Sequence, residues 1–304
     1  MSILRVLGLS ALAMSLSAEA REAAPEAVRP VAIVYSFAGE ASFAPHHSVR
    51  RPLRLFDRFP AGASLEVGPG SRLALAFMNG RRYELGEGSR VTLGAADLAS
   101  RNGPVRSLPP VSPLPRLAPI APDDHPGPKA GAVRIRSDRI EGIYPGRGAT
   151  ALASAAVLCF RNVAGAGRYW IEVEDGQGAV VYSQETASTK LSLPADALRP
   201  GVSYHWSVRT VDRSGPLARG EAEFATLDAE TAQAREMLRL LAEKTGDGEL
   251  TALLAGVDRE LGLLAEARTE MRSALRAAPM DTALAEALID LERHIEEAGF
   301  AAEN

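Results

Sequence analysis

The hydrophobic periodicity of this 304-residue chain changes near Leu227, and that change limits what the chain can fold into. Up to that residue, apolar and polar side chains alternate in short runs, which is typical of half-buried strands. Beyond it, apolar residues recur at three- and four-residue spacing, which is typical of amphipathic helices. We therefore expect a multidomain, mainly β protein with an α-helical C-terminal part.

The last β segment before the change, residues 191–227, predicts a hairpin. Tyr204, Trp206 and Val208 alternate with polar residues, so they are expected to face a core. A turn at residues 214–216 precedes a second alternating run. His205 falls on the opposite face, where a solvated histidine is the ordinary case. The hairpin is therefore expected to end a β-sandwich and not to form a catalytic site.

The first 20 residues predict an exported protein. Arg5 precedes an apolar run, and Ala18, Glu19 and Ala20 form an A-x-A cleavage pattern. The run is shorter than the roughly 20 apolar residues that a membrane-spanning helix needs, and no other stretch is long and apolar enough. We expect residues 1–20 to be a signal peptide and the mature protein to be periplasmic, without a transmembrane segment. An N-terminal helix of the fold is the alternative.

Charge and cysteine content argue against two further classes of protein. The net charge of -4 is spread over mixed charges, so no basic field favours nucleic acid. Cys159 is the only cysteine, which excludes an intramolecular disulfide. Its apolar neighbours predict a small buried side chain and not a reactive thiol.

The sequence gives little support for a metal or a catalytic site. His46 and His47 are adjacent, so in an extended chain they point to opposite sides and chelate poorly. Residues 123–125, Asp-Asp-His, are expected to form a flexible acidic loop. No nucleophile elbow, phosphate loop or zinc motif occurs. We expect no enzyme, no cofactor and no metal site, with a hydrolase whose carboxylates are assembled by folding as the alternative.

Residues 30–100 predict short antiparallel strands. Gly62, Gly70-Ser71, Asn79-Gly80 and Gly88-Ser89 punctuate the alternating runs, and Asn-Gly is a strong type I′ hairpin signal. Residues 53–93 resemble the bacterial FecR domain family in these turn positions. The resemblance implies an extracytoplasmic β domain that, in some members, passes a signal from an outer receptor to an inner regulator.

Residues 101–131 are dense in proline and predict a linker. Proline at this density disfavours a regular strand ladder and favours extended polyproline geometry. We expect a semi-rigid spacer or a strap on a neighbouring domain. A proline-rich ligand of a partner domain is the alternative.

Residues 132–227 predict an immunoglobulin-like sandwich, because short strands recur at about ten-residue spacing. Residues 175–178, Asp-Gly-Gln-Gly, are expected to form a turn between two of them. Leu198, Pro200-Gly201, Tyr204 and Trp206 are similar to the end of a fibronectin type III domain. That resemblance concerns the fold, and the family carries no chemistry that could be transferred.

Residues 228–298 predict four helices, with Asp228 and Asp281 as caps and Gly246 and Gly262 as breaks. Apolar stripes on each, including Met237 on the first, are expected to be buried against one another. Residues 251–279 resemble a single tetratricopeptide repeat, although Asp258 stands where an aromatic residue is usual. The resemblance implies protein binding along the inner helix. The residues that would point into its groove are Glu249, Arg259 and Glu260.

Capping of the β domain by the helices, or dimerisation through them, is an equal alternative. Trp170 lies out of phase with the core residues of its strand and is the better candidate for a surface contact, whereas Trp206 is in core phase. We expect an exported, non-enzymatic scaffold or sensor-accessory protein that makes protein–protein contacts in the cell envelope. A binder of peptidoglycan or another polysaccharide, through Trp170, is the alternative.

Overall fold

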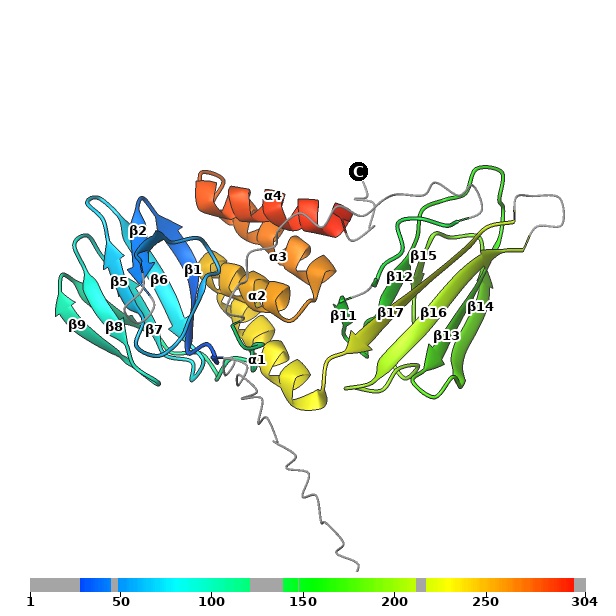
Figure 1. Cartoon of the computed structure of the whole chain (residues 1–304), viewed down its shortest axis with the longest axis horizontal. Coiled ribbons are helices and arrows are strands. Elements are labelled where there is room, and N and C mark those ends of the chain that lie inside the picture. Colours follow the sequence, from blue (N-terminus) through cyan, green and yellow to red (C-terminus); the bar gives the residue numbers. More distant parts are fainter. Residues whose placement is uncertain (1–27, 45–48, 121–138, 147, 212–216, 298–304) are drawn as a thin grey trace, which may run out of the picture.

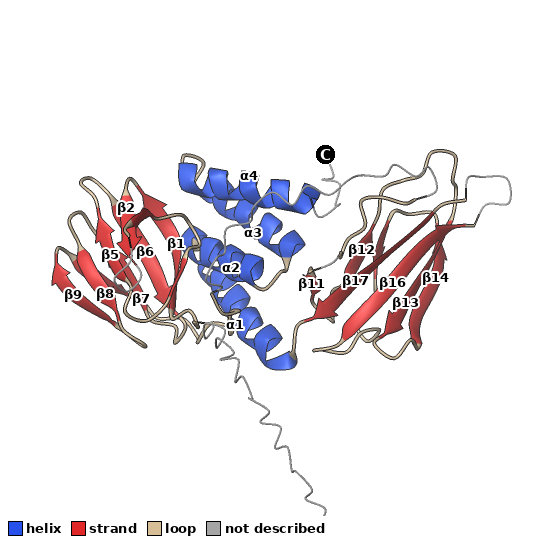
Figure 2. Ribbon diagram, in the orientation of Figure 1, coloured by secondary structure: helices blue, strands red, loops and turns tan. Residues whose placement is uncertain are grey.

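A computed structural model describes residues 28–44, 49–120, 139–146, 148–211 and 217–297. The predicted signal peptide, His46, His47, and the loop and turn predicted at 123–125 and 214–216 lie outside these residues. The described chain forms a first β domain, a β-sandwich and four helices that lie between them (Figure 1). Figure 2 colours the helices blue and the strands red, and shows the helices between the two β parts. The expected class, mainly β with C-terminal helices, is confirmed.

The first β domain consists of two five-stranded sheets. One has the order β10 (Val105–Leu108), β7 (Arg82–Leu85), β6 (Arg72–Phe77), β1 (Ala32–Ala38) and β4 (Arg58–Phe59). The other has the order β3 (Arg51–Pro52), β2 (Ala41–Ala44), β5 (Ser64–Val67), β8 (Arg90–Leu93) and β9 (Leu98–Asn102). All pairings within them are antiparallel.

The expected hairpin at Asn79-Gly80 connects β6 to β7. The Phe77 N–H donates to the Arg81 carbonyl at 2.8 Å, and Gly80 has a φ of 88°. The loop between this pair therefore holds three residues, 78–80, one more than a type I′ turn. A left-handed Gly at the last loop position is the usual solution for a three-residue hairpin loop.

Strands β1 and β6 are buried on both faces. The alternation at Leu73 and Leu75 predicted one buried face for β6, yet the intervening Ala74 and Ala76 are buried as well. The reason is that helices cover the second face of this sheet, whose residues share one hydrophobic core with the helices. An apolar run without alternation, such as residues 31–35, is what such a strand requires.

The first β domain extends into the region predicted to be a linker. Strand β10 pairs with β7 over four residues, and Pro104 and Pro109 stand on either side of β10 and not within it. Proline therefore removes no hydrogen bond from this ladder. Beyond β10, Val111, Leu114 and Leu117 are buried in the same core. The segment up to Leu117 thus belongs to the first domain, and the rest of the predicted linker, residues 121–131, is not described.

The sandwich has its own hydrophobic core. Its larger sheet has the order β11 (Thr150–Ala151), β17 (Arg219–Thr226), β16 (Ser203–Thr210), β13 (Tyr169–Asp175) and β14 (Val180–Thr186). Its smaller sheet pairs β12 (Val157–Cys159) with β15 (Lys190–Ser192). The predicted hairpin is β16–β17, and the predicted turn after Asp175 joins β13 to β14.

The core of the sandwich is organised around β16. Tyr204, Trp206 and Val208 are buried, as predicted, and the Trp206 Nε1–H donates to the Pro145 carbonyl at 2.9 Å. The Tyr204 hydroxyl accepts the Arg199 N–H at 2.7 Å, which fixes the loop before the strand. A buried indole and a buried phenol thus each have a polar partner.

Four helices follow the sandwich: α1 (Ala229–Thr245), α2 (Gly248–Glu260), α3 (Leu264–Ala277) and α4 (Thr282–Glu297). Asp228 caps α1 by accepting the Thr231 N–H at 2.9 Å, and Gly246 ends it in the left-handed conformation. Asp281 accepts the Leu284 N–H at 2.9 Å at the start of α4. The predicted caps are therefore confirmed.

The prediction that Met237 belongs to the buried apolar stripe on α1 is wrong. Met237 is 50 % exposed, whereas Arg235, two residues earlier, is buried together with Leu238 and Ala242. Arg235 can be buried because it has a carboxylate partner on α2. A charged residue with a fully buried partner thus takes a place that hydrophobic spacing assigns to methionine.

Candidate functional site

Helix α2 lies against the first β domain, at strand β1 and at the loop before β4. Gly256 makes this approach possible, since a Cβ at that position would lie 2.4 Å from Cδ1 of Phe56. Phe56 is itself in the left-handed region, with a φ of 68°, and its ring is buried. A non-Gly residue with this backbone is held in place by the packing around it.

An ion pair joins the same two elements. Arg58 Nε lies 2.8 Å from Glu260 Oε2, and each side chain is only 14 % exposed. Arg58 also donates through Nη1 to the Ala118 carbonyl at 2.8 Å. The Arg58 guanidinium therefore connects β4 with the end of α2 and with Ala118, in the segment that follows β10.

Glu249 lies at the start of α2 and is half-buried. Burial raises the pKa of its carboxyl, and the nearby carboxylates of Asp247 and Glu84 add to this, while Arg72 and Arg82 oppose it. Glu84, Arg72 and Arg82 all belong to β6 and β7. Glu249 therefore faces the β domain of its own chain.

Arg259 differs from the other two predicted groove residues because it is exposed. It lies close enough to Asp57, in the loop before β4, to lower the pKa of that carboxyl, which burial raises. Of the three predicted partner-binding residues on α2, Glu260 forms an ion pair with the first β domain, and Glu249 and Arg259 lie near charged groups of that domain. The same chain thus takes up part of the face of α2 that the repeat resemblance assigns to a partner.

A buried ion pair on the other side of α2 was not predicted from the sequence. Arg235 of α1 donates to Asp258 through two bonds, Nε to Oδ1 at 2.9 Å and Nη2 to Oδ2 at 2.7 Å. Their relative exposures are 3 % and 0 %. Asp258 stands where the repeat pattern usually has an aromatic residue, and a carboxylate in an apolar stripe was the signal for a buried cation.

The carboxyl of Asp258 is strongly perturbed by this environment. Burial raises its pKa to about 6, although Arg235 lowers it through hydrogen bonds and charge. Glu266 and Glu270, both on α3, also have pKa values raised by burial. Three carboxyls and one guanidinium from α1, α2 and α3 thus form one coupled set.

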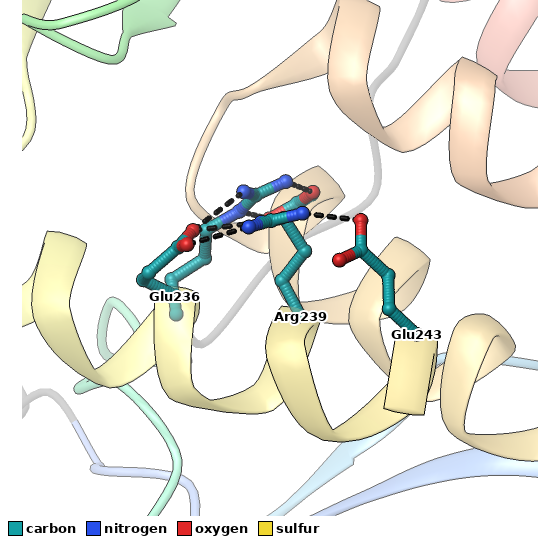
Figure 3. A network of polar contacts seen from close by, with 5 residues as sticks. Glu236, Arg239 and Glu243 are labelled. Atoms are coloured by element: carbon teal, nitrogen blue, oxygen red, sulfur yellow. Dashed lines mark hydrogen bonds and ion pairs between the residues drawn. The ribbon is translucent and has the colours of Figure 1, made fainter. Parts of the chain in front are cut away.

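The exposed side of α1 carries a second network. Arg239 Nη2 lies 2.6 Å from Glu236 Oε1, and Arg239 also pairs with Glu243 one turn later (Figure 3). Glu236 connects the network to the buried pair, because its Oε2 lies 4.0 Å from Nη1 of Arg235. Pairs at three- and four-residue spacing stabilise a helix by a few tenths of a kcal/mol each. Their arrangement is suited to support and not to bond-making chemistry.

Trp170 lies far from α2, on the outer face of the large sandwich sheet. It is half-buried, and the Arg209 guanidinium carbon lies 5.9 Å from its ring centroid. Its Nε1–H points to Glu172 Oε2 at 3.5 Å. The structure therefore does not bring the four predicted site residues together, since Trp170 belongs to a separate surface.

Two further properties concern the described residues. No three histidine, cysteine, aspartate or glutamate side chains among them gather closely enough to hold a metal ion. None of the described helices combines the length and the apolar character that crossing a membrane requires.

Cys159 is half-buried and packs against the core that the helices share with the first β domain.

No family model matches the sequence, and no curated protein matches it. Among solved structures, CopC from Methylosinus trichosporium OB3b is similar at 21 % identity and a TM-score of 0.24, over 30 % of this chain and 94 % of that chain. Chicken CNTN1 FN1-FN3 domains are similar at 10 % identity and a TM-score of 0.23, over 62 % of this chain and 56 % of that chain. A β-D-glucuronidase from Dictyoglomus thermophilum is similar at 9 % identity and a TM-score of 0.18, over 64 % of this chain and 43 % of that chain. Likenesses this weak support no conclusion about function.

Proposed function

We propose that the protein is an exported, non-enzymatic scaffold or sensor-accessory protein that makes protein–protein contacts in the cell envelope. The observation that carries this proposal is the position of the helices, which connect two β modules. A scaffold joins several binding modules on one support, and a helical unit that contacts both β modules provides such a support.

The contacts of the helical unit to the two modules differ in kind. Toward the first β domain it shares a hydrophobic core and the Arg58–Glu260 ion pair. Toward the sandwich, Tyr144 and Ala149 extend this core, and two hydrogen bonds are added: the Thr150 N–H donates to the Gly262 carbonyl at 3.0 Å, and the Ala265 N–H donates to the Tyr144 hydroxyl at 3.2 Å. The first contact is an extended apolar one, and the second is smaller and more polar. Smaller, more polar interfaces between domains permit relative motion.

Two of the sequence resemblances support the same proposal. A FecR-like domain implies an extracytoplasmic sensor module, and a fibronectin-like sandwich implies a spacer or an edge for partners. The A-x-A pattern ending at Ala20 supports export. N-terminal sequencing of the protein recovered from the periplasm is expected to begin at Arg21, and a chain retained intact in the cytoplasm would contradict export.

The scaffold function is tested by site-directed photo-crosslinking of the full chain in cells. Crosslinkers are placed at exposed Met237 on α1 and at exposed Val180 on β14, with buried Leu253 as the matched control. We expect a discrete crosslinked protein at an exposed site and none at the control. A third crosslinker at exposed Val49 samples the first β domain, and a chain that gives no protein adduct from any of the three exposed positions would refute the scaffold.

A polysaccharide binder is the second candidate, because Trp170 presents part of its ring on an outer sheet face beside Arg209. Indole rings of this kind stack on sugar rings. Trp170→Ala is expected to abolish co-sedimentation with purified peptidoglycan, while Trp206→Phe, in the core, serves as the control for a general loss of structure. Retention of binding by Trp170→Ala would exclude this site.

A further inference from the structure

The edges of the described sheets differ in how well they are protected from pairing with another strand. Edge strands β3, β4 and β11 have two residues each, and β12 and β15 have three. Strand β10 is flanked by prolines and carries Arg106, and β9 carries Arg101. Short length, proline and charge are the usual devices that prevent edge pairing.

Strand β14 has neither the short length nor the proline or basic residue of these edges, although its pairing with β13 contains one register shift, between Val180 and Tyr182. It is seven residues long, Val180–Thr186, contains no proline, lysine or arginine, and stands at the end of the large sandwich sheet. Its single charged residue, Glu185, is paired with Arg168 at 2.7 Å. Within the part of the chain that the structure describes, β14 pairs with β13 alone. Val180, at its start, is 53 % exposed.

The opposite edge of the same sheet is covered. Strand β11 contacts the turn between α2 and α3 through the Thr150 N–H and the Gly262 carbonyl. The large sheet therefore has one edge closed by the helices and one long open edge. Such an edge offers a row of backbone donors and acceptors to an extended segment.

The sheet face next to β14 carries more acidic than basic side chains. Glu172 and Glu174 project from β13 on the face that also carries Glu185, and Arg209 of β16 lies on this face over the Trp170 ring. Neither Glu172 nor Glu174 has an ion pair with a lysine or arginine among the described residues, and the nearest basic group to Glu174 is His205, at 4.0 Å. Two carboxylates thus lie one strand in from the open edge without a strong counter-ion.

We propose that β14 pairs with an extended segment of a protein partner that carries lysine or arginine at alternate positions. This deepens the proposed scaffold function and rests on it, because it names the surface and the chemistry of one of its partners. Backbone hydrogen bonds to β14 supply the pairing, and the acidic face selects the side chains.

The register explains how a cation would reach the carboxylates. Ser183 of β14 lies opposite Glu172 of β13. A strand added beside β14 would stand about 4.8 Å further out, and successive side chains on it would alternate between the two faces. A lysine or arginine in the row of Ser183 is long enough to cross this small residue and approach Glu172. A glutamate in that row would meet a like charge.

A second copy of this chain fits the edge less well. Antiparallel pairing of β14 with itself would bring no cation to Glu172 or Glu174, because β14 contains no lysine or arginine. It would instead extend the acidic face of one copy into that of the other. The acidic surface therefore favours a basic partner over self-pairing.

The test measures binding of fluorescent peptides to the full chain by anisotropy. One peptide, about nine residues long to match an edge strand, alternates Lys and Val, and its control alternates Glu and Val. A third carries the Lys–Val sequence with N-methyl groups on alternate backbone nitrogens, which removes its hydrogen-bond donors on one edge. We expect saturable binding of the first peptide alone, weakened by added salt.

Two variants place the binding on β14. Ser183→Lys puts a cation in the row that the peptide lysine would occupy, and is expected to weaken binding about tenfold, equivalent to about 1.4 kcal/mol. Ser100→Lys makes the same change on the exposed edge strand β9 and is expected to have no effect. Glu172→Gln with Glu174→Gln is expected to weaken binding by a similar factor and to remove most of its salt dependence.

Equal binding of the Lys–Val and Glu–Val peptides, binding of the N-methylated peptide, or insensitivity to Ser183→Lys would overturn the proposal. So would a dimer in sedimentation analysis that Ser183→Lys dissociates, because the second copy would then be the occupant. Protein crosslinks from Met237 on α1, with no peptide binding at β14, would leave the scaffold function standing and refute this inference alone.

Discussion

The buried pair of Arg235 and Asp258 allows a sharp test of what holds α1 on α2. Three variants are needed: Arg235→Met, Asp258→Leu and the double variant. Each single change removes one partner from a pair whose exposures are 3 % and 0 %, so Asp258 loses its hydrogen-bonded cation, or Arg235 keeps only the more distant Glu236, at 4.0 Å, and the charges of Glu266 and Glu270. The double variant removes both charges and replaces them with apolar side chains.

The expected magnitudes follow from what each remaining group can do. Breaking a buried pair costs about 3–5 kcal/mol, because an uncompensated charge stays in the interior. After Arg235→Met, Asp258 can take up a proton and lose its charge, and its pKa is already raised to about 6. After Asp258→Leu, the guanidinium cannot lose its proton. We expect Asp258→Leu to be the more destabilising single variant, and the double variant to return to within about 1 kcal/mol of the parent or exceed it.

The assay is urea unfolding of the full chain at pH 7 with two optical probes. Far-ultraviolet circular dichroism follows the helices, whereas tryptophan fluorescence follows the sandwich, since the chain's 2 tryptophans, Trp170 and Trp206, both lie there. A loss of about 3 kcal/mol moves the helical midpoint by about 1–2 M urea. The fluorescence midpoint is expected to stay in place and serves as an internal control.

Two results would refute this reasoning. If both single variants shift the helical midpoint by less than the equivalent of about 1 kcal/mol, the pair is not desolvated as the structure describes it. If the double variant is as unstable as the worse single variant, the loss comes from packing and not from the unpaired charge.

Three further predictions concern packing and pH. Gly256→Ala should lower the stability of the helical unit by about 1–2 kcal/mol in urea unfolding, because the clash with Phe56 outweighs the helix propensity of alanine. The control is Gly176→Ala, whose Cβ would lie 3.7 Å from its nearest neighbour. A stabilised Gly256→Ala variant would contradict the close contact. Trp206→Phe should cost about 2–4 kcal/mol in the sandwich through the cavity and the unpaired Pro145 carbonyl, measured by thermal unfolding, and a cost below about 1 kcal/mol would speak against it. Burial raises the pKa of Asp258 from 3.8 to about 6, so between these values the folded chain holds a proton that the unfolded chain releases. The free energy of unfolding of the helices should therefore fall by about 1 kcal/mol between pH 5 and pH 7. Asp258→Asn should reduce this pH dependence, and an unchanged dependence in the variant would assign it to other groups.

Local structure was largely predictable from the sequence. Asp228 and Gly246 delimit α1 because caps satisfy the terminal backbone groups of any helix, wherever it packs. The alternation of Tyr204 and Trp206 identifies the core face of β16, because side chains on a strand alternate with period two. These signals lie within a few residues of one another and need no knowledge of the rest of the chain.

Contacts between distant segments were not predictable in the same way. Helical periodicity shows that α2 buries a face, but it does not show that β1, more than two hundred residues earlier, covers it. The apolar run at residues 31–35 was the available signal, since a strand without alternation is covered on both faces. Arg235 was missed because hydrophobic spacing treats a charged residue as exposed, and its partner Asp258 lies on another helix.

The core shared by strand β1 and helix α2 makes the sandwich an insertion within another folding unit. The first and last parts of this unit are separated in the chain by residues 139–227, which form a core of their own, while Tyr144 and Ala149 at its border join the shared core. Synthesis and the proposed export both release the chain N-terminus first, so the first β domain emerges long before α2. Until residues 248–260 have emerged, the second face of β1 and β6 remains uncovered and apolar. The sandwich, whose contacts lie within one stretch of chain, can fold earlier, so the middle of this protein is expected to reach its final structure before either end.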